Sequence, residues 1–259
     1  GFRSGDPTII TGPGRTQTDQ LPANVDVLIV GSGSAGLTLA AQLSAFPEIT
    51  TRLVEVKSGP MEKGQADGVS CRSMEMFEAF GFAHTVMREA YWVNETTFWK
   101  TDPDDANRIV RTGRIQDVEE GLSEMPHVIL NQARVHDMYL NVMQRSAHGL
   151  APDYDRRLDR LDVAETGTHP VTATIIHSPA DADLTEETVR ARYVVGCDGA
   201  RSTVRAAMGL ELKGDSANKA WGVMDVLVVT DFPSIRQKTV VQAADSGALL
   251  VIPREGGYM

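Results

Sequence analysis

The fold is decided by the stretch Asp-Val-Leu-Ile-Val-Gly-Ser-Gly-Ser-Ala-Gly at residues 26–36. Its first five residues form an apolar run bounded by glycine, which is the pattern of a buried strand. Residues 35–46 have the pattern of a helix that ends before Pro47, and residues 51–56 form a second short strand that ends near an acid. Strand, glycine turn, helix and strand predict a βαβ unit with a right-handed crossover.

The three glycines of this stretch and an acid after the second strand are typical of dinucleotide binding. Gly31 permits a tight turn, Gly33 allows the backbone to approach a pyrophosphate, and Gly36 allows the helix to pack closely on the strand. The helix N-terminus offers N–H groups to phosphates, and Glu55 can accept hydrogen bonds from ribose hydroxyls. The alternative is a glycine-rich turn without a ligand, and the pattern alone does not separate FAD from NAD.

Bulk composition excludes some function classes. The net charge of −10 disfavours nucleic-acid binding, which needs a basic face. No apolar run reaches the roughly 18–20 residues of a membrane span, and the first residues do not resemble a secretion signal. The two cysteines, Cys71 and Cys197, cannot build a disulfide framework, so we expect free thiols in a reducing, cytoplasmic compartment.

The rest of the chain alternates helical and extended patterns. Helices are expected at residues 70–80, 133–147 and 202–208; strands are expected at residues 98–99, 127–130, 171–177, 189–195, 223–229, 239–243 and 248–252; an acidic loop is expected at 181–187 and a hairpin turn at 253–259. The expected organisation is an N-terminal arm (1–24), a cofactor domain with inserted segments (25–215) and the start of a β-rich substrate domain (216–259) that continues past the end of the chain.

A second motif, Gly-Cys-Asp-Gly at residues 196–199, follows an apolar strand and precedes a helix. Asp198 and Gly199 also fit a simple β-turn before an N-capped helix, so this motif has a structural alternative.

In combination, these motifs resemble the class A flavoprotein aromatic hydroxylases. The glycine fingerprint, Gly-Gln-Ala-Asp-Gly at 64–68 followed by Cys71-Arg72, and Gly-Cys-Asp-Gly at 196–199 occur in the order and spacing of that family. The 64–68 element and Ile-Pro-Arg-Glu at 252–255 resemble its phenol 2-monooxygenase and 3-hydroxybenzoate 4-monooxygenase branch. The resemblance implies an α/β fold, namely a Rossmann-like FAD-binding domain with an inserted β-rich substrate domain.

The resemblance also implies a set of cofactor residues. Arg72 would lie against the FAD pyrophosphate, Gln132 near the ribose and flavin, and Asp198 in contact with FAD, with the Asp-Gly segment also serving NAD(P)H. Ser34 stands where many members of the family carry proline. The complete expected set is Gly31, Gly33, Ser34, Ala35, Gly36, Glu55, Val56, Lys57, Gln65, Gly68, Arg72, Gln132, Asp198 and Gly199.

Asp67 is the expected catalytic base. In the family a carboxylate at this place hydrogen-bonds the substrate hydroxyl and helps to remove its proton, and burial that raises the pKa of the carboxyl suits that task. The alternative is that Asp67 only shapes an Asp-Gly turn. Lys238 is the candidate partner for a substrate carboxylate, and its alternative is a solvated lysine at a strand edge.

The resemblance implies hydroxylation of a phenolic ring by NADPH, FAD and O2. The expected substrate is 3-hydroxybenzoate, which would give 3,4-dihydroxybenzoate, with phenol as the alternative. A non-hydroxylating FAD oxidoreductase and a nucleotide-binding regulatory or carrier protein are the rival classes, although the Trp-x-Trp-x-Ile element of halogenases is missing. We also expect a homodimer, a second FAD motif outside this chain and no metal, because the six histidines lack ligand spacing.

Overall fold

The computed structural model describes residues 20–180, 183–243 and 247–259. These residues divide into two compact units. The five-stranded unit contains residues 20–62 and 136–218, and the two-sheet unit contains residues 63–135 and 219–259. Most of the expected N-terminal arm lies outside the described residues.

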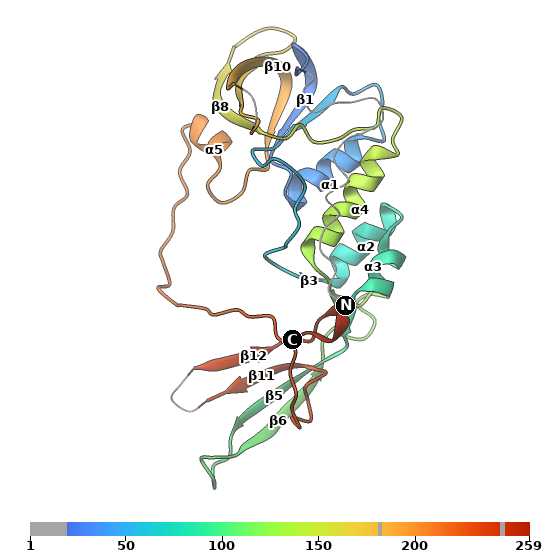
Figure 1. Cartoon of the computed structure of the whole chain (residues 1–259), viewed down its shortest axis with the longest axis vertical. Coiled ribbons are helices and arrows are strands. Elements are labelled where there is room, and N and C mark those ends of the chain that lie inside the picture. Colours follow the sequence, from blue (N-terminus) through green and yellow to red (C-terminus); the bar gives the residue numbers. More distant parts are fainter. Residues whose placement is uncertain (1–19, 181–182, 244–246) are drawn as a thin grey trace. The chain divides into compact units, whose positions relative to one another are not determined.

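The five-stranded unit is built around the strand that the sequence predicts. Strands β1 (Asn24–Val30), β2 (Thr51–Val54), β8 (Arg156–Val163), β9 (Val171–His177) and β10 (Thr185–Gly196) form one sheet in the order β2-β1-β10-β9-β8. Strand β1 pairs in parallel with both β2 and β10, whereas β9 pairs antiparallel with both β10 and β8. Helix α1 (Ser34–Leu43) connects β1 to β2 (Figure 1). The predicted βαβ unit is therefore confirmed.

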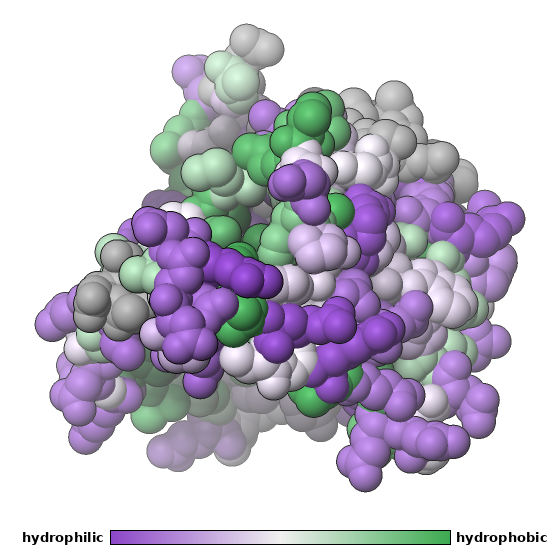
Figure 2. Space-filling view, turned by 90° about the horizontal axis from the view of Figure 1, so that it is seen from below, coloured by the Kyte–Doolittle hydropathy of each residue, from purple (hydrophilic) through white to green (hydrophobic). Residues whose placement is uncertain are grey.

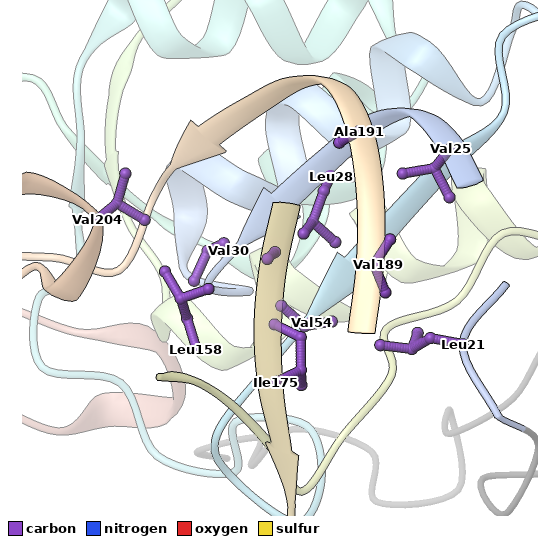
Figure 3. Close-up of a cluster of buried hydrophobic side chains, with 11 residues drawn as sticks. Leu21, Val25, Leu28, Val30, Val54, Leu158, Ile175, Val189, Ala191 and Val204 are labelled. Atoms are coloured by element: carbon purple, nitrogen blue, oxygen red, sulfur yellow. The ribbon is translucent and has the colours of Figure 1, made fainter. Parts of the chain in front are cut away.

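The core of this unit explains the uninterrupted apolar run of β1. Figure 3 shows Val25, Leu28 and Val30 of β1 together with residues of other strands of the sheet, including Val54 of β2 and Ile175 of β9. All five side chains are buried. Burial of one such side chain contributes about 1.5–3 kcal/mol, so this cluster is a main source of stability for the sheet.

Two further helices belong wholly or partly to this unit. Helix α5 (Thr203–Ala207) begins after Ser202, whose hydroxyl accepts a hydrogen bond from Arg205 N–H at 3.0 Å. Helix α4 (Gln132–Gln144) begins in the two-sheet unit and ends in the five-stranded unit. Val135, Met138 and Tyr139 are buried, as the apolar periodicity of this segment predicts.

The two-sheet unit holds the remaining elements. One sheet has the order β12-β11-β5-β6, with β5 (Glu95–Thr101), β6 (Ile109–Gln116), β11 (Lys238–Gln242) and β12 (Ala248–Val251). The other has the order β3-β7-β4, with β3 (Gly68–Val69), β4 (Tyr91–Val93) and β7 (His127–Ile129). Helices α2 (Cys71–Ala79) and α3 (Ala83–Glu89) and the 3-10 turn η1 (Glu255–Gly257) complete the unit.

Several sequence predictions are corrected by the structure. Residues 223–229 do not form a regular strand. Within this described segment, only the backbone of Val226 pairs with another segment, through two hydrogen bonds of 3.0 Å with Met259. Residues 185–187, predicted as loop, begin β10 and pair with β9. Helix α3 and strand β6 were not predicted. Residues 63–135 form a compact unit with residues 219–259, and the expected domain boundaries, with inserted segments in 25–215, stay a prediction.

Apolar residues reach the surface among polar ones on the face in Figure 2. Val229, Val223 and Trp221 are the most exposed large apolar residues among those described. Within the described ranges, no helix is both long enough and apolar enough to cross a bilayer.

Candidate functional site

The glycine turn has the geometry that the fingerprint requires. Gly31 has a φ of +100°, and a Cβ added there would lie 2.5 Å from the carbonyl oxygen of Cys197. A Cβ added at Gly36 would lie 1.9 Å from the carbonyl oxygen of Gly31. Neither position tolerates a side chain, because in both cases the obstacle is backbone. The turn after β1 therefore packs against helix α1 on one side and the 196–199 motif on the other.

Gly33 differs from the other two glycines. A Cβ at this position would meet no atom within 4 Å, so space rather than packing surrounds it. Gly33 is also the N-cap of α1, which has no side-chain cap and no acidic residue in its first turn. An uncapped helix N-terminus with open backbone beside it is suited to phosphate oxygens. These residues fit the pyrophosphate of a dinucleotide.

Glu55 lies at the end of β2 against the glycine turn. Its Oε2 accepts hydrogen bonds from Ser32 N–H at 2.7 Å and from the Ser32 hydroxyl at 2.9 Å, and its Oε1 accepts one from Lys57 N–H at 3.0 Å. The carboxylate is buried and thus fixes the loop that precedes α1. Its place agrees with the predicted ribose contact, which stays a prediction. Val56 is exposed next to it.

Ser34 is exposed at the start of α1, and its Oγ lies 2.9 Å from Nε2 of His136, a buried residue of α4. Burial is the main factor that lowers the pKa of His136 to about 4; Lys57 acts in the same direction and Glu55 opposes it. The imidazole is therefore neutral at neutral pH. Metal-ligand spacing, the pattern by which histidines are recognised in a sequence, does not point to this residue.

Asp198 is held by helix α5. Its Oδ2 accepts hydrogen bonds from Thr203 N–H at 2.6 Å and Val204 N–H at 3.2 Å, and its Oδ1 accepts one from the Ser202 hydroxyl at 2.6 Å. The structural alternative for this motif, a capped helix after a turn, is thus present. The same motif also abuts Gly31, so the turn is placed beside the fingerprint. Gly199 has a φ of +81°, which favours glycine. The contact of Asp198 with FAD stays a prediction.

In the two-sheet unit, Asp67 forms an ion pair with Arg254. The Nη2 atom of Arg254 lies 2.8 Å from Oδ2 of Asp67, and its Nη1 lies 2.7 Å from Oδ1 of Asp225. The guanidinium is 9% exposed and also lies 3.5 Å from Oε1 of Glu255. One buried cation therefore orients the predicted catalytic base and two further carboxylates.

The loop that carries Asp67 is fastened to the N-terminus of α4. Asn131 accepts hydrogen bonds through Oδ1 from Gly64 N–H at 3.0 Å and Ala133 N–H at 3.1 Å. Gln132 accepts one through Oε1 from Gln65 N–H at 3.1 Å.

The backbone N–H of Gln132 donates to Oδ1 of Asp67 at 3.4 Å, and that of Asn131 donates to Oε1 of Glu255 at 3.1 Å. Gln65, Asp67 and Gln132 thus come together as one cluster. The predicted contacts of Gln65, Gly68 and Gln132 with FAD are untested.

Asp67 lines a cavity of about 360 Å³ together with Lys63, Gly64, Asn131, Asp225, Arg254 and Tyr258. Burial raises the pKa of Asp67 above its usual value of 3.8, whereas the charge of Arg254 opposes the rise. A carboxyl group in this position can accept a proton from a ligand hydroxyl and hold it, because its basicity exceeds that of an exposed aspartate.

Lys238 is not among the residues that line this cavity. Its Nζ lies 3.1 Å from Oδ1 of Asp117, whose Oδ2 lies 2.5 Å from Nδ1 of His127. The strand-edge alternative is wrong in part, because Lys238 is partly buried and ion-paired. Nε2 of His127 in turn lies 3.6 Å from the position of a Cβ on Gly68, which is next to Asp67 in sequence. The cluster thus borders the segment of the expected base.

Arg72 lies in the first turn of α2 and is largely exposed, with 84% of its side chain accessible. Its guanidinium pairs with Glu75 at 2.8 Å. The structure thus places Arg72 on the surface of the two-sheet unit, where a phosphate could reach it, and the predicted phosphate contact is untested.

Comparison with known proteins assigns the chain to a class. A model of the FAD binding domain family matches residues 24–258, so the chain belongs to this family of FAD binding domains. The expected α/β fold and the expected resemblance are confirmed.

Named relatives belong to the expected branch. The chain is 58% identical to a 3-hydroxybenzoate 4-monooxygenase of Comamonas testosteroni, an alignment that covers 100% of this chain and 41% of the relative. It is 33% identical to a phenol 2-monooxygenase of Aspergillus fumigatus, over 90% of this chain and 37% of that one. The chain therefore spans about two fifths of the length of these relatives.

Among solved structures, a flavin-dependent monooxygenase, PieE, in complex with FAD and substrate is similar. The TM-score is 0.61 at 26% identity, with 74% of this chain and 33% of that chain covered. This likeness extends across most of the described fold.

Asn131, Asp225 and Glu255 belong to the Asp67 cluster but are not predicted from the sequence. The signal for Glu255 is the Ile-Pro-Arg-Glu segment at 252–255, which resembles the expected branch. Asp225 has no local signal, because it contacts Arg254 from a segment whose composition predicts a strand.

Proposed function

We propose that this chain binds FAD and forms part of a monooxygenase that uses NADPH and O2 to hydroxylate a phenolic ring. The substrate that we propose first is 3-hydroxybenzoate, which gives 3,4-dihydroxybenzoate. The relative at 58% identity carries the name of this activity. The observation on the chain itself is Asp67, a carboxylate of raised pKa held by Arg254 at the wall of a cavity.

Bound FAD would supply the reduction of O2 and the transfer of one oxygen atom. The glycine turn, the N-terminus of α1 and Glu55 would hold the adenosine and pyrophosphate portions. We propose Arg72, Gln65, Gly68, Gln132 and Asp198 as further cofactor contacts, as the resemblance implies.

Asp67 would accept the proton of the substrate hydroxyl. Removal of this proton raises the electron density of the ring at the ortho and para positions, which favours attack on an electrophilic oxygen. Arg254 would keep Asp67 in one orientation, and its positive charge would keep the carboxylate ionised over more of the pH range. Without this cation, burial alone would hold a larger share of the carboxyl group protonated.

We propose that Lys238 serves the carboxylate of a hydroxybenzoate. Its partner Asp117 is linked to the segment that carries Asp67, because His127 lies 2.5 Å from Asp117 and 3.6 Å from the position of a Cβ on Gly68. A substrate carboxylate could replace Asp117 as the partner of the ammonium group, or approach it alongside. Phenol lacks a carboxylate and would gain no binding energy from Lys238, so this residue would favour 3-hydroxybenzoate over phenol.

The decisive experiment is NADPH oxidation by the purified full-length protein, with and without 3-hydroxybenzoate and then phenol, together with product analysis. Stimulation with one equivalent of dihydroxy product per NADPH would support the proposal and rank the substrates. A yellow, FAD-loaded protein that neither substrate stimulates would retain the flavoprotein assignment and exclude the hydroxylase.

We further propose that the protein is a cytoplasmic homodimer that acts in the breakdown of aromatic compounds. Light scattering of the full-length protein tests the dimer, and cell fractionation tests the location.

A further inference from the structure

The two serines of the glycine turn are each fixed by a different buried partner. Ser32 donates its hydroxyl to Glu55, and Oγ of Ser34 lies 2.9 Å from Nε2 of His136. Ser34 is exposed as the first residue of α1, whereas His136 is 2% exposed. The imidazole thus approaches the Ser34 hydroxyl from the interior of the same unit, behind the face that the turn presents.

We propose that His136 is a positioning residue for the cofactor, which holds the Ser34 hydroxyl so that it donates a hydrogen bond to the pyrophosphate. This inference rests on the proposed FAD function, and it adds a side-chain donor to the backbone donors of the fingerprint.

The hydrogen-bonding capacity of the pair supports this arrangement. A neutral imidazole carries one N–H, and the Nε2–H tautomer donates to Ser34 Oγ. The serine hydrogen then points away from the imidazole and can reach a phosphate oxygen. Hydrogen bonds to charged groups are the stronger ones, so a phosphate favours this tautomer.

The surroundings of His136 favour the neutral form. The charged groups that act on it are Lys57, which follows β2 and disfavours a second cation, and Glu55, whose carboxylate is already occupied by Ser32 and Lys57 backbone N–H groups. The pair therefore provides a donor to the phosphate without a formal charge in the buried interior, where an unpaired cation would be costly.

The place of Ser34 in α1 makes the hydroxyl useful. No side chain caps α1, and its first turn contains no acidic residue that would repel a phosphate. Gly33 leaves open space directly before it. The hydroxyl thus stands at the end of the helix where the backbone N–H groups also converge on an anion. Proline at this position would lack the hydroxyl.

The test is the dissociation constant of FAD for the purified full-length apoprotein, measured by fluorescence titration. We expect Ser34→Ala and His136→Leu each to weaken FAD binding about tenfold, the size of one hydrogen bond to a charged group. The double variant should be no weaker than either single variant, because His136 acts through Ser34. His136→Gln, whose amide can occupy the position of Nε2, should recover most of the affinity.

Two measurements separate this role from a purely structural one. Competition by ADP should weaken in Ser34→Ala and His136→Leu, whereas competition by adenosine, which has no phosphate, should not change. The control Ser44→Ala removes a hydroxyl from the other end of α1, where it donates to the Ala41 carbonyl, and should bind FAD like the wild type.

Each outcome decides the matter. Wild-type affinity in Ser34→Ala, additive losses in the double variant, or an equal loss of adenosine binding would overturn the inference while FAD binding itself stands. If His136→Leu does not fold, Ser34→Ala and His136→Gln carry the same test. A wild-type protein that binds no FAD would overturn the proposed function and this inference together.

Discussion

The Nη2 atom of Arg254 lies 2.8 Å from Oδ2 of Asp67, which joins the Gln-Ala-Asp-Gly element to the Ile-Pro-Arg-Glu element. The same guanidinium holds Asp225 at 2.7 Å. Two short motifs that lie far apart in sequence thus form one site. Neither motif predicts this contact by itself, so its role is tested on the folded protein.

Asp67→Asn should abolish most hydroxylation and leave FAD bound. The amide keeps the size of the side chain but cannot accept the phenol proton, and loss of a general base costs about 10²–10⁴-fold in rate. Product formation from 3-hydroxybenzoate, measured together with flavin content, checks this. Asp104→Asn, in the exposed turn after β5, is the matched control. Full hydroxylation by Asp67→Asn would show that the base is elsewhere.

Arg254→Gln should move the acid limb of the pH–rate profile to higher pH. The charge of Arg254 lowers the pKa of Asp67 against the effect of burial, so removing it lets that pKa rise further. Asp67 must be ionised to act as a base, and activity therefore appears only at higher pH in the variant. The measurement is kcat/KM between pH 5 and 9. Arg108→Gln, an exposed arginine of the same unit, should leave the limb in place; an unshifted limb in Arg254→Gln would separate the ion pair from catalysis.

Lys238→Met should raise the KM for 3-hydroxybenzoate by about tenfold or more and leave that for phenol nearly unchanged. The variant removes the cation proposed for the carboxylate and keeps most of the unbranched side chain, and one ionic hydrogen bond contributes about 1.5–3 kcal/mol. Steady-state kinetics with both substrates test this. Lys100→Met, an exposed lysine on β5, controls for loss of charge. An equal rise for both substrates would assign Lys238 a structural role with Asp117.

Gly33→Ala and Gly36→Ala should fail in different ways. A Cβ at Gly36 would meet the Gly31 carbonyl oxygen at 1.9 Å, and backbone cannot move aside, so we expect destabilisation on the order of several kcal/mol. A Cβ at Gly33 meets nothing, so that variant should fold and lose FAD affinity because the methyl group occupies the approach of the phosphates. Thermal unfolding with and without FAD distinguishes the two. Equal stability of both apoproteins would contradict the packing argument.

The sequence could predict the βαβ core because its determinants are local. The apolar run of β1, the glycine turn and the position of Glu55 each follow from neighbouring residues. The N-cap Ser70 and the positive φ of Gly81 likewise explain why the boundaries of α2 were predicted closely. The strand prediction for residues 223–229 was wrong because its determinants are not local. A segment of β-rich composition forms a regular strand only when a neighbouring strand pairs with its backbone.

The site was predictable only where one motif contains it. Asp67 lies in a recognisable element, but Arg254 and Asp225 come from other parts of the chain. The periodicity of a sequence does not predict contacts between such distant residues. His136 was missed because its neighbours Met138 and Tyr139 mark that stretch as a buried helix face. A polar residue on such a face needs a partner, and this requirement was the available signal for Ser34.

Protein stability should fall as the pH decreases from about 6.5 towards 4, and His136 should account for part of the slope. The folded-state pKa of His136 is lowered from 6.5 to about 4, so in this window the unfolded chain binds a proton that the folded protein does not. Protonation therefore favours unfolding, with a slope of up to about 1.4 kcal/mol per pH unit from this one group. Above pH 6.5 the contribution of His136 to the free energy of unfolding is complete and no longer changes.

Urea unfolding at pH 4.5, 5.5 and 6.5 measures the slope, which should be smaller in His136→Gln because glutamine does not titrate. His148→Gln, at an exposed histidine of the same unit whose Nε2 lies 3.0 Å from the Pro47 carbonyl oxygen, is the matched control and should retain the wild-type slope. Identical slopes in wild type and His136→Gln would mean that folding does not lower the pKa of His136, which would contradict the argument from its burial.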